Sequence, residues 1–405
     1  MRRTMRMVAV LLLILMTFCL AGCSALFSNV RKLKITDNGY VYAEKDTYFI
    51  SGDLNIPEKL NGKTVVGIRS NAFSSSSGLS GVTVTLPDTV KAIGANAFYN
   101  TGAVFEELDL TSVREVGSSA FYGCSIETLY INDNVKNYPT NTSWTNGMKS
   151  VDRIVLAEGT TTCYDFLTSD VAKIVSSISL PSTVTTINDY AFYGCSKLKS
   201  ITIPSKVTKI GNYAFKETSL VLDNLDLTSV SYVGSGAFDG CKIRKITVGP
   251  EISGYSSKWD DNIKELKTLV IEDGVTEVES FLSEGMKKSL ETVNLPDGLE
   301  TICDGAFEDC SALKTVFFPL SITSIGENAF KGTGLKIQEL DITKVEFIGA
   351  SAFDGCTVTT LYADSSISNY DSSWKYNMTV EAVYVPDSVS SYTKWFDSSI
   401  IHQIK

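Results

Sequence analysis

The stretch Leu198-Lys199-Ser200-Ile201-Thr202-Ile203-Pro204, followed by Val207, Ile210-Gly211 and Ala214-Phe215, shows the unit from which most of the chain is built. Apolar and polar residues alternate over residues 201–203, which predicts a strand with one buried face. Gly211 permits a tight bend, and the Ala214-Phe215 pair suits a short helical turn that directs its ring inward. The stretch therefore predicts a strand followed by a bend and a turn.

This unit recurs throughout the chain. An aromatic residue, most often the Phe of an Ala-Phe pair, returns at steps of 21 to 26 residues, and a second series of apolar residues ends the expected strands in phase with it. Such self-similarity is the signature of stacked repeats, in which no single unit buries its own apolar face. The aromatic series is Phe73, Phe98, Phe121, Trp144, Phe166, Phe192, Phe215, Phe238, Trp259, Phe281, Phe307, Phe330, Phe353, Trp374 and Phe396.

A longer period is superimposed on the short one. The three tryptophans of the aromatic series are 115 residues apart, and the phrase Leu-Asp-Leu-Thr that begins at Leu108 returns at Leu225 and, with Ile for the second Leu, at Leu340. Five units therefore make one superunit of about 115 residues, which is present three times. Because no Gly/Ser-rich or Pro-rich linker interrupts them, we expect one continuous solenoid over residues 51–405.

Several phrases resemble BspA-like leucine-rich repeat surface proteins of bacteria. They are Ala191-Phe192-Tyr193-Gly194-Cys195-Ser196-Lys197-Leu198 and the run from Ile203-Pro204 through Ile210-Gly211 to Ala214-Phe215. Leu54-Asn55-Ile56-Pro57 resembles the opening unit of that family. The resemblance covers about residues 50–400. The fourth unit of each superunit keeps the aromatic residue and loses the Ile-Gly step, so we expect local irregularity there.

The period and this resemblance predict a leucine-rich repeat solenoid. We expect about fifteen short parallel strands on a concave face, with short helical or irregular segments on the convex face. The resemblance implies a bacterial cell-surface protein that binds or adheres, commonly to host or neighbouring-cell macromolecules. The alternatives are a structural stalk or scaffold without a specific ligand and, more remotely, a glycan hydrolase.

The N-terminal segment has the features of an export signal. Three arginines among the first six residues precede an eleven-residue apolar run over residues 8–18, which is shorter than a membrane-spanning helix needs. Leu20-Ala21-Gly22-Cys23 then resembles a bacterial lipobox, in which the signal is cut before a cysteine that carries lipid. We therefore predict a lipoprotein signal peptide over residues 1–22 and a lipid anchor at Cys23. The alternatives are a plain signal peptide and an uncleaved anchor.

The ends of a repeat solenoid need covering. Residues 23–50 are expected to form a lipid-anchored tether, over residues 24–32, and an N-terminal capping hairpin. Lys34 to Ile50 alternates polar and apolar residues around Asp37-Asn38-Gly39, which is a hairpin signal. The candidates for a C-terminal cap are Trp395, Phe396, Ile400, Ile401 and Ile404.

The composition excludes several classes of function. The only histidine, His402, lies near the C-terminus, and no phosphate-binding loop or Cys-x-x-Cys motif is present, so we expect no enzyme, no metal site and no cofactor. A net charge of -10 without a basic run argues against a nucleic-acid partner. Glu107 with Asp109 and Glu339 with Asp341 form acidic clusters, which favour a solvated face over a weak calcium site.

Nine cysteines are present, of which Cys19 leaves with the signal and Cys23 takes lipid. Five of the other seven stand three residues after a member of the aromatic series, and never on adjacent units. Two units apart means about 10 Å, beyond the distance of about 7 Å that a disulfide spans between Cα atoms. We therefore expect mostly free thiols in the core, at Cys124, Cys163, Cys195, Cys241, Cys303, Cys310 and Cys356.

The candidate ligand site lies on the outward strand positions. The position before the end of each strand is mostly small or polar at first, and on the last four strands it holds Phe317, Asp341, Tyr362 and Tyr384. Exposed aromatic residues on consecutive units are typical of binding surfaces. Together with Glu339, these residues are predicted to bind an extracellular protein or a glycan. The alternative is drift among duplicated repeats. The three tryptophans of the aromatic series are expected in the core rather than on a stacking surface.

Overall fold

The computed structural model describes residues 30, 32–44, 47, 52–74, 78–138, 144–251, 255, 259, 262–365, 370–387 and 396–404. The predicted signal peptide, Cys23, most of the predicted tether, and Trp395 lie outside these residues. Within the described part of the chain, no helix combines the length and the apolar character needed to cross a membrane.

The described residues form a parallel β-solenoid with few helices. Contacts between residues divide it into two compact units. Unit 1 lies within residues 1–157 and 166–176, and unit 2 lies within residues 158–165 and 177–405. No change of composition marks this division in the sequence, which predicts a single solenoid over residues 51–405.

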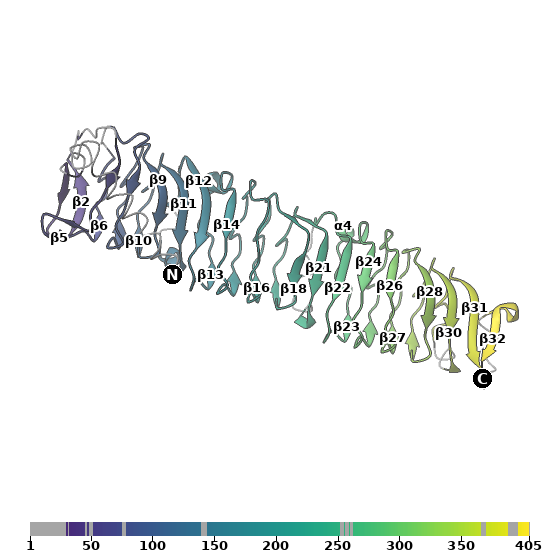
Figure 1. Cartoon of the computed structure of the whole chain (residues 1–405). Helices are drawn as coiled ribbons and strands as arrows, with labels where there is room; N and C mark the ends of the chain where they lie inside the picture. Colours follow the sequence, from purple (N-terminus) through teal and green to yellow (C-terminus); the bar gives the residue numbers. More distant parts are fainter. Residues whose placement is uncertain are drawn as a thin grey trace, which may run out of the picture. The chain divides into compact units, whose positions relative to one another are not determined.

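The long strands of unit 1 form a parallel ladder (Figure 1). Tyr130 lies opposite Asp109 on one neighbouring strand and opposite Val155 on the other. Along β11 the buried residues are Ile126, Leu129 and Ile131, so strict alternation, in which successive side chains point to opposite faces, holds over residues 129–131. The strands of this ladder are β3 (Leu54–Asn55), β7 (Val84–Thr85), β9 (Val104–Asp109), β11 (Ser125–Ile131) and β12 (Ser150–Leu156).

The long-strand ladder of unit 2 contains a gap. Residues 201–203 form no strand, although the sequence predicts one, and Ile201 and Ile203 are half-buried. The next long strand, β18 (Leu225–Leu227), pairs instead with β21 (Lys245–Val248) on its other side. The other long strands are β14 (Ser177–Ser179), β22 (Thr268–Ile271), β24 (Thr292–Asn294), β26 (Thr315–Phe317), β28 (Lys336–Asp341), β30 (Thr357–Tyr362), β31 (Thr379–Pro386) and β32 (Ile401–Ile404).

Each unit also has a second ladder, which the sequence does not predict and in which every strand except β2 has two residues; these are called the short strands below, although β3 and β7 of the long-strand ladder also have two residues. The expected bend at Ile210-Gly211 is instead the end of a two-residue strand, β16 (Lys209–Ile210), which pairs in parallel on both sides. A Cβ atom on Gly211 would lie 2.3 Å from the amide nitrogen of Asp189 on the preceding turn. Close approach of two backbones therefore requires glycine here.

The short strands of unit 1 are β2 (Tyr40–Ala43), β6 (Gly67–Ile68), β8 (Ala92–Ile93) and β10 (Glu115–Val116). Those of unit 2, besides β16, are β13 (Thr162–Cys163), β15 (Thr186–Ile187), β19 (Tyr232–Val233), β23 (Glu277–Val278), β25 (Thr301–Ile302), β27 (Ser324–Ile325) and β29 (Phe347–Ile348).

Five further strands of the described residues lie outside these ladders. β1 (Leu33–Ile35) pairs antiparallel with β2 across the Asp37-Asn38-Gly39 turn, and β2 then pairs in parallel with β6. β4 (Lys59–Leu60) and β5 (Lys63–Thr64) form a second antiparallel hairpin. In unit 2, β17 (Val221–Leu222) pairs in parallel with β20 (Lys242–Ile243). This extra pair follows closely in sequence on the gap in the long-strand ladder.

The Ala-Phe pairs form turns rather than the short helical turns that the sequence predicts. The reason is that their amide groups pair with the next turn of the solenoid: the N–H of Phe215 donates to the carbonyl of Ala237. The ring of Phe215 is fully buried and lies 5.5 Å from that of Phe192 and 5.3 Å from that of Phe238, between centroids. The helices are η1 (Asp133–Asn137), α3 (Ser169–Ala172), α4 (Glu284–Lys287) and η5 (Ser398–Ile400).

The three tryptophans of the aromatic series are buried in the core, as predicted. The residues that follow them in the first two superunits, Phe166 and Phe281, are only half-buried, whereas the other members of the aromatic series are buried. Helices α3 and α4 follow these two residues and supply buried Val171 and Met286. A short helix whose apolar side chain enters the core therefore follows the fifth aromatic residue of these two superunits, one unit after the place where the sequence predicts irregularity.

The prediction of free thiols is confirmed. The seven cysteines in the described part of the chain all lie outside disulfide bonds, and six of them are buried. Cys303 is partly exposed. Stacking of small thiol-bearing residues inside the core accounts for these cysteines without any disulfide.

Candidate functional site

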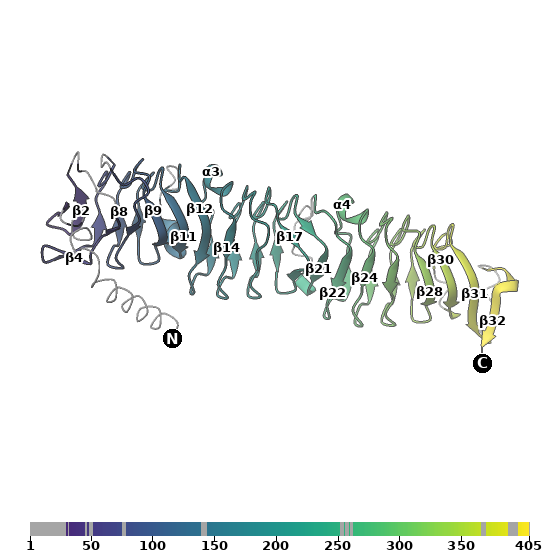
Figure 2. The ribbon, with the colours of Figure 1, turned by 45° about the horizontal axis from the view of Figure 1, so that its top comes forward.

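Four strands of unit 2 place a row of side chains on one surface. β28, β30, β31 and β32 pair in this order and in parallel, so Asp341 lies opposite Tyr362, Tyr362 opposite Tyr384, and Tyr384 opposite His402. Figure 2 shows these strands side by side. The residues before and after each tyrosine in the strand are buried, so the row itself projects outward.

The rings of this row stack on one another. The centroids of Tyr362 and Tyr384 are 5.4 Å apart with 28° between the ring planes, and those of Tyr384 and His402 are 5.0 Å apart with 25° between the planes. Both tyrosines are half-buried and His402 is exposed. The structure thus brings two of the residues singled out in the sequence together, outside the core. Tyr362, Tyr384 and His402 are called the aromatic row below.

Asp341 lies beside the aromatic row, and one oxygen of its carboxylate already accepts hydrogen bonds within its own turn. Its Oδ1 accepts hydrogen bonds from the N–H of Thr343 at 2.9 Å and from the hydroxyl of Thr343 at 2.6 Å. Asp109 and Asp226 make the same two bonds in their own turns, so these bonds belong to the repeat. Glu339 is exposed on the same strand as Asp341. A role of either carboxylate in ligand binding remains a prediction.

Phe317 is not part of the row. Its ring is 71% exposed, and it lies on β26 opposite Asn294 of β24. β26 ends one sheet and β28 begins another, so the backbone does not hold Phe317 in register with Asp341. Phe317 therefore adds exposed apolar area to the ladder without stacking on the tyrosines.

His402 is the member of the row that reasoning from the sequence missed. His402 lies near the chain end, where chains usually fray, so reasoning from the sequence assigns it to no site. The signal available in the sequence is Ile401, which lies opposite the buried Val383 of the ladder, so that the next residue, His402, takes the outward position of Tyr384. β32 continues the ladder, and this strand carries His402 onto the surface.

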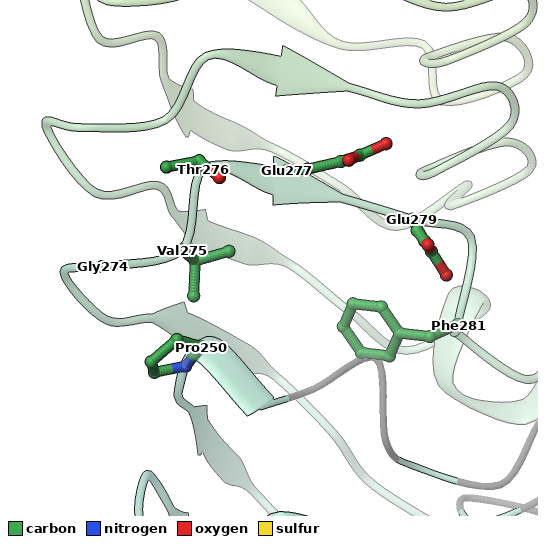
Figure 3. A pocket seen from close by; sticks show the side chains of 7 residues that line it. All are labelled: Pro250, Gly274, Val275, Thr276, Glu277, Glu279 and Phe281. Carbon is green, nitrogen blue, oxygen red and sulfur yellow. The ribbon is translucent and has the colours of Figure 1, made fainter.

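Unit 2 also has a hollow of about 210 Å³, in which Glu277, Glu279 and Phe281 project from the chain of β23 and the segment after it (Figure 3). The Oε1 atom of Glu277 accepts a hydrogen bond from the thiol of Cys303 at 2.9 Å. Burial, reinforced by this bond and by nearby carboxylates, raises the pKa of Cys303 to about 12. A raised pKa favours the protonated thiol at neutral pH, and the thiolate is the nucleophilic form of cysteine.

Metal chemistry finds no support in the geometry. In the described ranges of the chain, no three or more His, Cys, Asp and Glu side chains gather where they could hold a metal ion. The two acidic clusters expected from the sequence instead lie on the solvated surface of the long-strand ladders, where Asp109 and Asp341 each bind the threonine two residues later.

Stacked parallel turns of this length, with inward aliphatic side chains and a buried aromatic series, define a leucine-rich repeat solenoid. A family model described as the BspA type leucine-rich repeat region, in six copies, matches residues 66–166, 170–282 and 284–401. The chain belongs to this family. No curated protein sequence matches it.

Several solved structures of bacterial proteins are similar to this chain. A leucine-rich repeat protein from Bacteroides ovatus is 19% identical, with 92% of this chain and 98% of that chain covered and a TM-score of 0.39. A leucine-rich cell surface protein from Faecalibacterium prausnitzii is 19% identical, with 90% and 94% covered and a TM-score of 0.32. A leucine-rich repeat protein from Eubacterium ventriosum is 23% identical, with 75% and 94% covered and a TM-score of 0.34.

Proposed function

We propose that this protein is a lipid-anchored protein of the bacterial cell surface that binds an extracellular protein or a glycan. Membership of the BspA type repeat family supports a binding or adhesion role. The basic start, the apolar run and the Leu20-Ala21-Gly22-Cys23 phrase support export and anchoring through Cys23. The acidic net charge of -10 disfavours nucleic acid as the partner.

The observation that carries the proposal is the aromatic row. Tyrosine rings supply rigid apolar area at a low conformational-entropy cost, and their hydroxyl groups remain available for hydrogen bonds. Paired strands hold successive members of the row about 4.8 Å apart, so little further ordering is required when a ligand binds. Asp341 and Glu339 at the border of the row add acceptors that would orient hydroxyl or amide groups of the ligand.

A structural stalk is the second candidate. The buried aromatic series supports it, because stacked rings such as Phe192, Phe215 and Phe238 stabilise the solenoid without any ligand. A stalk does not require stacked aromatic rings on its outer surface, however. The exposed position of His402 and the half-buried rings of Tyr362 and Tyr384 therefore favour binding over a stalk.

The test uses the full-length protein in detergent, applied to a glycan array and to a set of immobilised extracellular-matrix proteins. Replacing Tyr362 and Tyr384 together by Ala should weaken binding by more than about 2 kcal/mol if they are hot spots. The melting temperature should hardly change, because both rings lie outside the core. Tyr130→Ala is the matched control, since Tyr130 occupies the same strand position in unit 1.

Three results distinguish the candidates. Selective loss of binding in the double variant supports the aromatic row as the site. Binding equal to that of the unaltered protein places the ligand elsewhere. Absence of binding to every probe favours the stalk.

A further inference from the structure

A second group of aromatic side chains lies on the turns of unit 2, where Tyr190 and Tyr193 are exposed and Tyr213 is half-buried. We call these three residues the tyrosine cluster. Tyr190 is 44% exposed and Tyr193 is 37% exposed. The ring of Tyr190 lies 5.8 Å from that of Tyr193, with 68° between the planes, and 5.4 Å from that of Tyr213, with 36° between the planes. The cluster is therefore a continuous group of rings that faces more than one direction.

The backbone of the cluster adopts a conformation that tyrosine disfavours. Tyr190 has a φ of 58° and Tyr213 a φ of 53°, and a bulky side chain in this left-handed region is a genuine outlier. Other turns place glycine, asparagine or serine at the same position, also with positive φ. These residues are Asn71, Asn96, Ser119, Gly236, Gly305, Asn328 and Ser351. The two tyrosines thus replace residues that fit the turn with less strain.

Glu217 extends the same pattern. It has a φ of 62° at a position where the turns before and after it have Gly194 and Gly240, and its Oε1 accepts a hydrogen bond from the Tyr193 hydroxyl at 2.7 Å. Among the described residues with positive φ, four are neither Gly, Asn, Asp nor Ser, and the tyrosine cluster and its Glu217 partner account for three of them. Backbone strain of this kind concentrates at functional sites.

Neighbouring residues hold the rings in place. The ring of Tyr213 lies over Gly236, where a Cβ atom would come within 2.7 Å of its Cε1. The ammonium group of Lys216 lies 5.0 Å from the centroid of the Tyr213 ring and 2.9 Å from the carboxylate of Asp239. The rings are therefore fixed before any ligand arrives, although they are too exposed to act as core residues.

We propose that the tyrosine cluster binds pyranose units of a glycan. A pyranose ring has apolar C–H faces, which stack on exposed aromatic faces, and hydroxyl edges, which need planar acceptors and donors. Glu217 supplies a carboxylate beside Tyr193. Asp189 supplies a second one on the turn that carries Tyr190, where it also accepts the N–H of Asn212 at 2.8 Å. The Lys216 ammonium pairs with Asp239, so no concentrated positive charge favours a phosphorylated ligand. This site is independent of the aromatic row.

The decisive variant replaces Tyr190 and Tyr213 together by Asn, the residue that other turns carry at this position. Binding of the full-length protein in detergent is measured by calorimetry with three probes: the hexamers of β-1,4-linked glucose, β-1,4-linked N-acetylglucosamine and α-1,4-linked glucose. The unaltered protein should bind at least one hexamer, and the double variant should bind that hexamer about tenfold or more weakly. Its melting temperature should stay the same or rise, because asparagine relieves the strain.

Two further variants sharpen the test. Glu217→Gly should weaken the same binding without lowering the melting temperature, since glycine occupies the equivalent position on both neighbouring turns. Tyr130→Ala is the matched control and should bind the hexamer unchanged, since it removes an outward tyrosine of unit 1 that belongs to neither proposed site. The proposal is overturned if the unaltered protein binds none of the hexamers or if the Asn double variant binds equally well. A large fall in melting temperature of that variant would instead assign the tyrosines to stability and would also overturn it.

Discussion

The hydroxyl of Thr218 lies 3.4 Å from the thiol of Cys241 on the next turn, and both groups lie within reach of the carbonyl oxygen of Phe215, at 2.8 Å and 3.6 Å. A buried thiol thereby finds polar partners inside an apolar core. This arrangement explains why threonine and cysteine alternate on neighbouring turns. The same contact joins Thr101 to Cys124 at 3.6 Å and Thr333 to Cys356 at 3.4 Å.

These thiols predict a loss of stability in alkaline solution. Burial raises the pKa of Cys124 and Cys241 to about 11, and that of Cys195 and Cys310 to about 12, from an ordinary value of 9.0. Their contribution to stability is therefore complete below pH 9 and is lost as the pH rises through the raised values. The free energy of unfolding in urea should fall between pH 9 and about pH 12.

The control for this prediction separates thiols from other groups that titrate in the same range. Replacing Cys195 and Cys310 together by Ala should flatten the alkaline decline relative to the unaltered protein. A double variant whose free energy of unfolding declines with pH as steeply as that of the unaltered protein would show that other groups cause the decline.

Loss of a ring from the buried aromatic series should destabilise the solenoid strongly. Phe215 is fully buried between two stacked rings, so Phe215→Ala should cost about 3–5 kcal/mol. Because repeats contact only their neighbours, the loss could also divide unfolding into two transitions. Phe281→Ala is the matched control and should cost less, since that ring is half-buried. Thermal and urea denaturation measure both effects, and equal costs would contradict the burial difference.

The carboxylate of Asp341 is expected to stabilise its turn regardless of any ligand. Asp341→Ala removes two hydrogen bonds to Thr343, and Asp226→Ala removes the same pair to Thr228. Each variant should therefore lose about 1 kcal/mol of stability, measured as the shift of the urea midpoint. If only Asp341→Ala also weakens ligand binding, the carboxylate has a second role. A variant that keeps full stability would show that these bonds contribute nothing.

The lipid anchor makes a separate prediction. Cys23→Ser should leave the protein soluble and without lipid, because only the cysteine thiol accepts the lipid of a lipobox. Membrane fractionation and mass spectrometry of the mature N-terminus measure this outcome, with Cys19→Ser as the control that should remain membrane-bound. A Cys23→Ser protein that still carries lipid would rule out this anchor.

The repeat period made much of the fold predictable. Rings such as Phe215 and Trp259 fall on the expected inward positions, and the alternation along the strands correctly places Tyr362 and Tyr384 on the outer surface. These successes share a cause: a side chain repeated many times at one spacing reveals the face it occupies, because stacking requires the same face to be buried on every turn.

The features that escaped prediction depend on short or local geometry. A strand of two residues such as β16 is too short to show alternation, so the sequence indicates only a bend at Gly211. Residues 201–203 have the alternating pattern of a strand but form none. Whether a segment pairs as a strand also depends on the backbone path of the neighbouring turn, which the pattern does not reveal. The turn at Tyr190 requires a left-handed backbone conformation. A tyrosine by itself favours other backbone conformations, so the residue type does not reveal this one.

The glycine that follows some of the short strands has a consequence for how this protein changes over generations. At Gly211, Gly234, Gly326 and Gly349 a Cβ atom would lie 2.3–2.5 Å from an amide nitrogen of the preceding turn, so any other residue would push neighbouring turns apart. Outward positions such as 362 and 384 carry no such constraint. Duplication of a superunit therefore copies a fixed spacing together with freely mutable surface positions. New recognition chemistry can arise on the copy while the pitch of the turns is inherited unchanged.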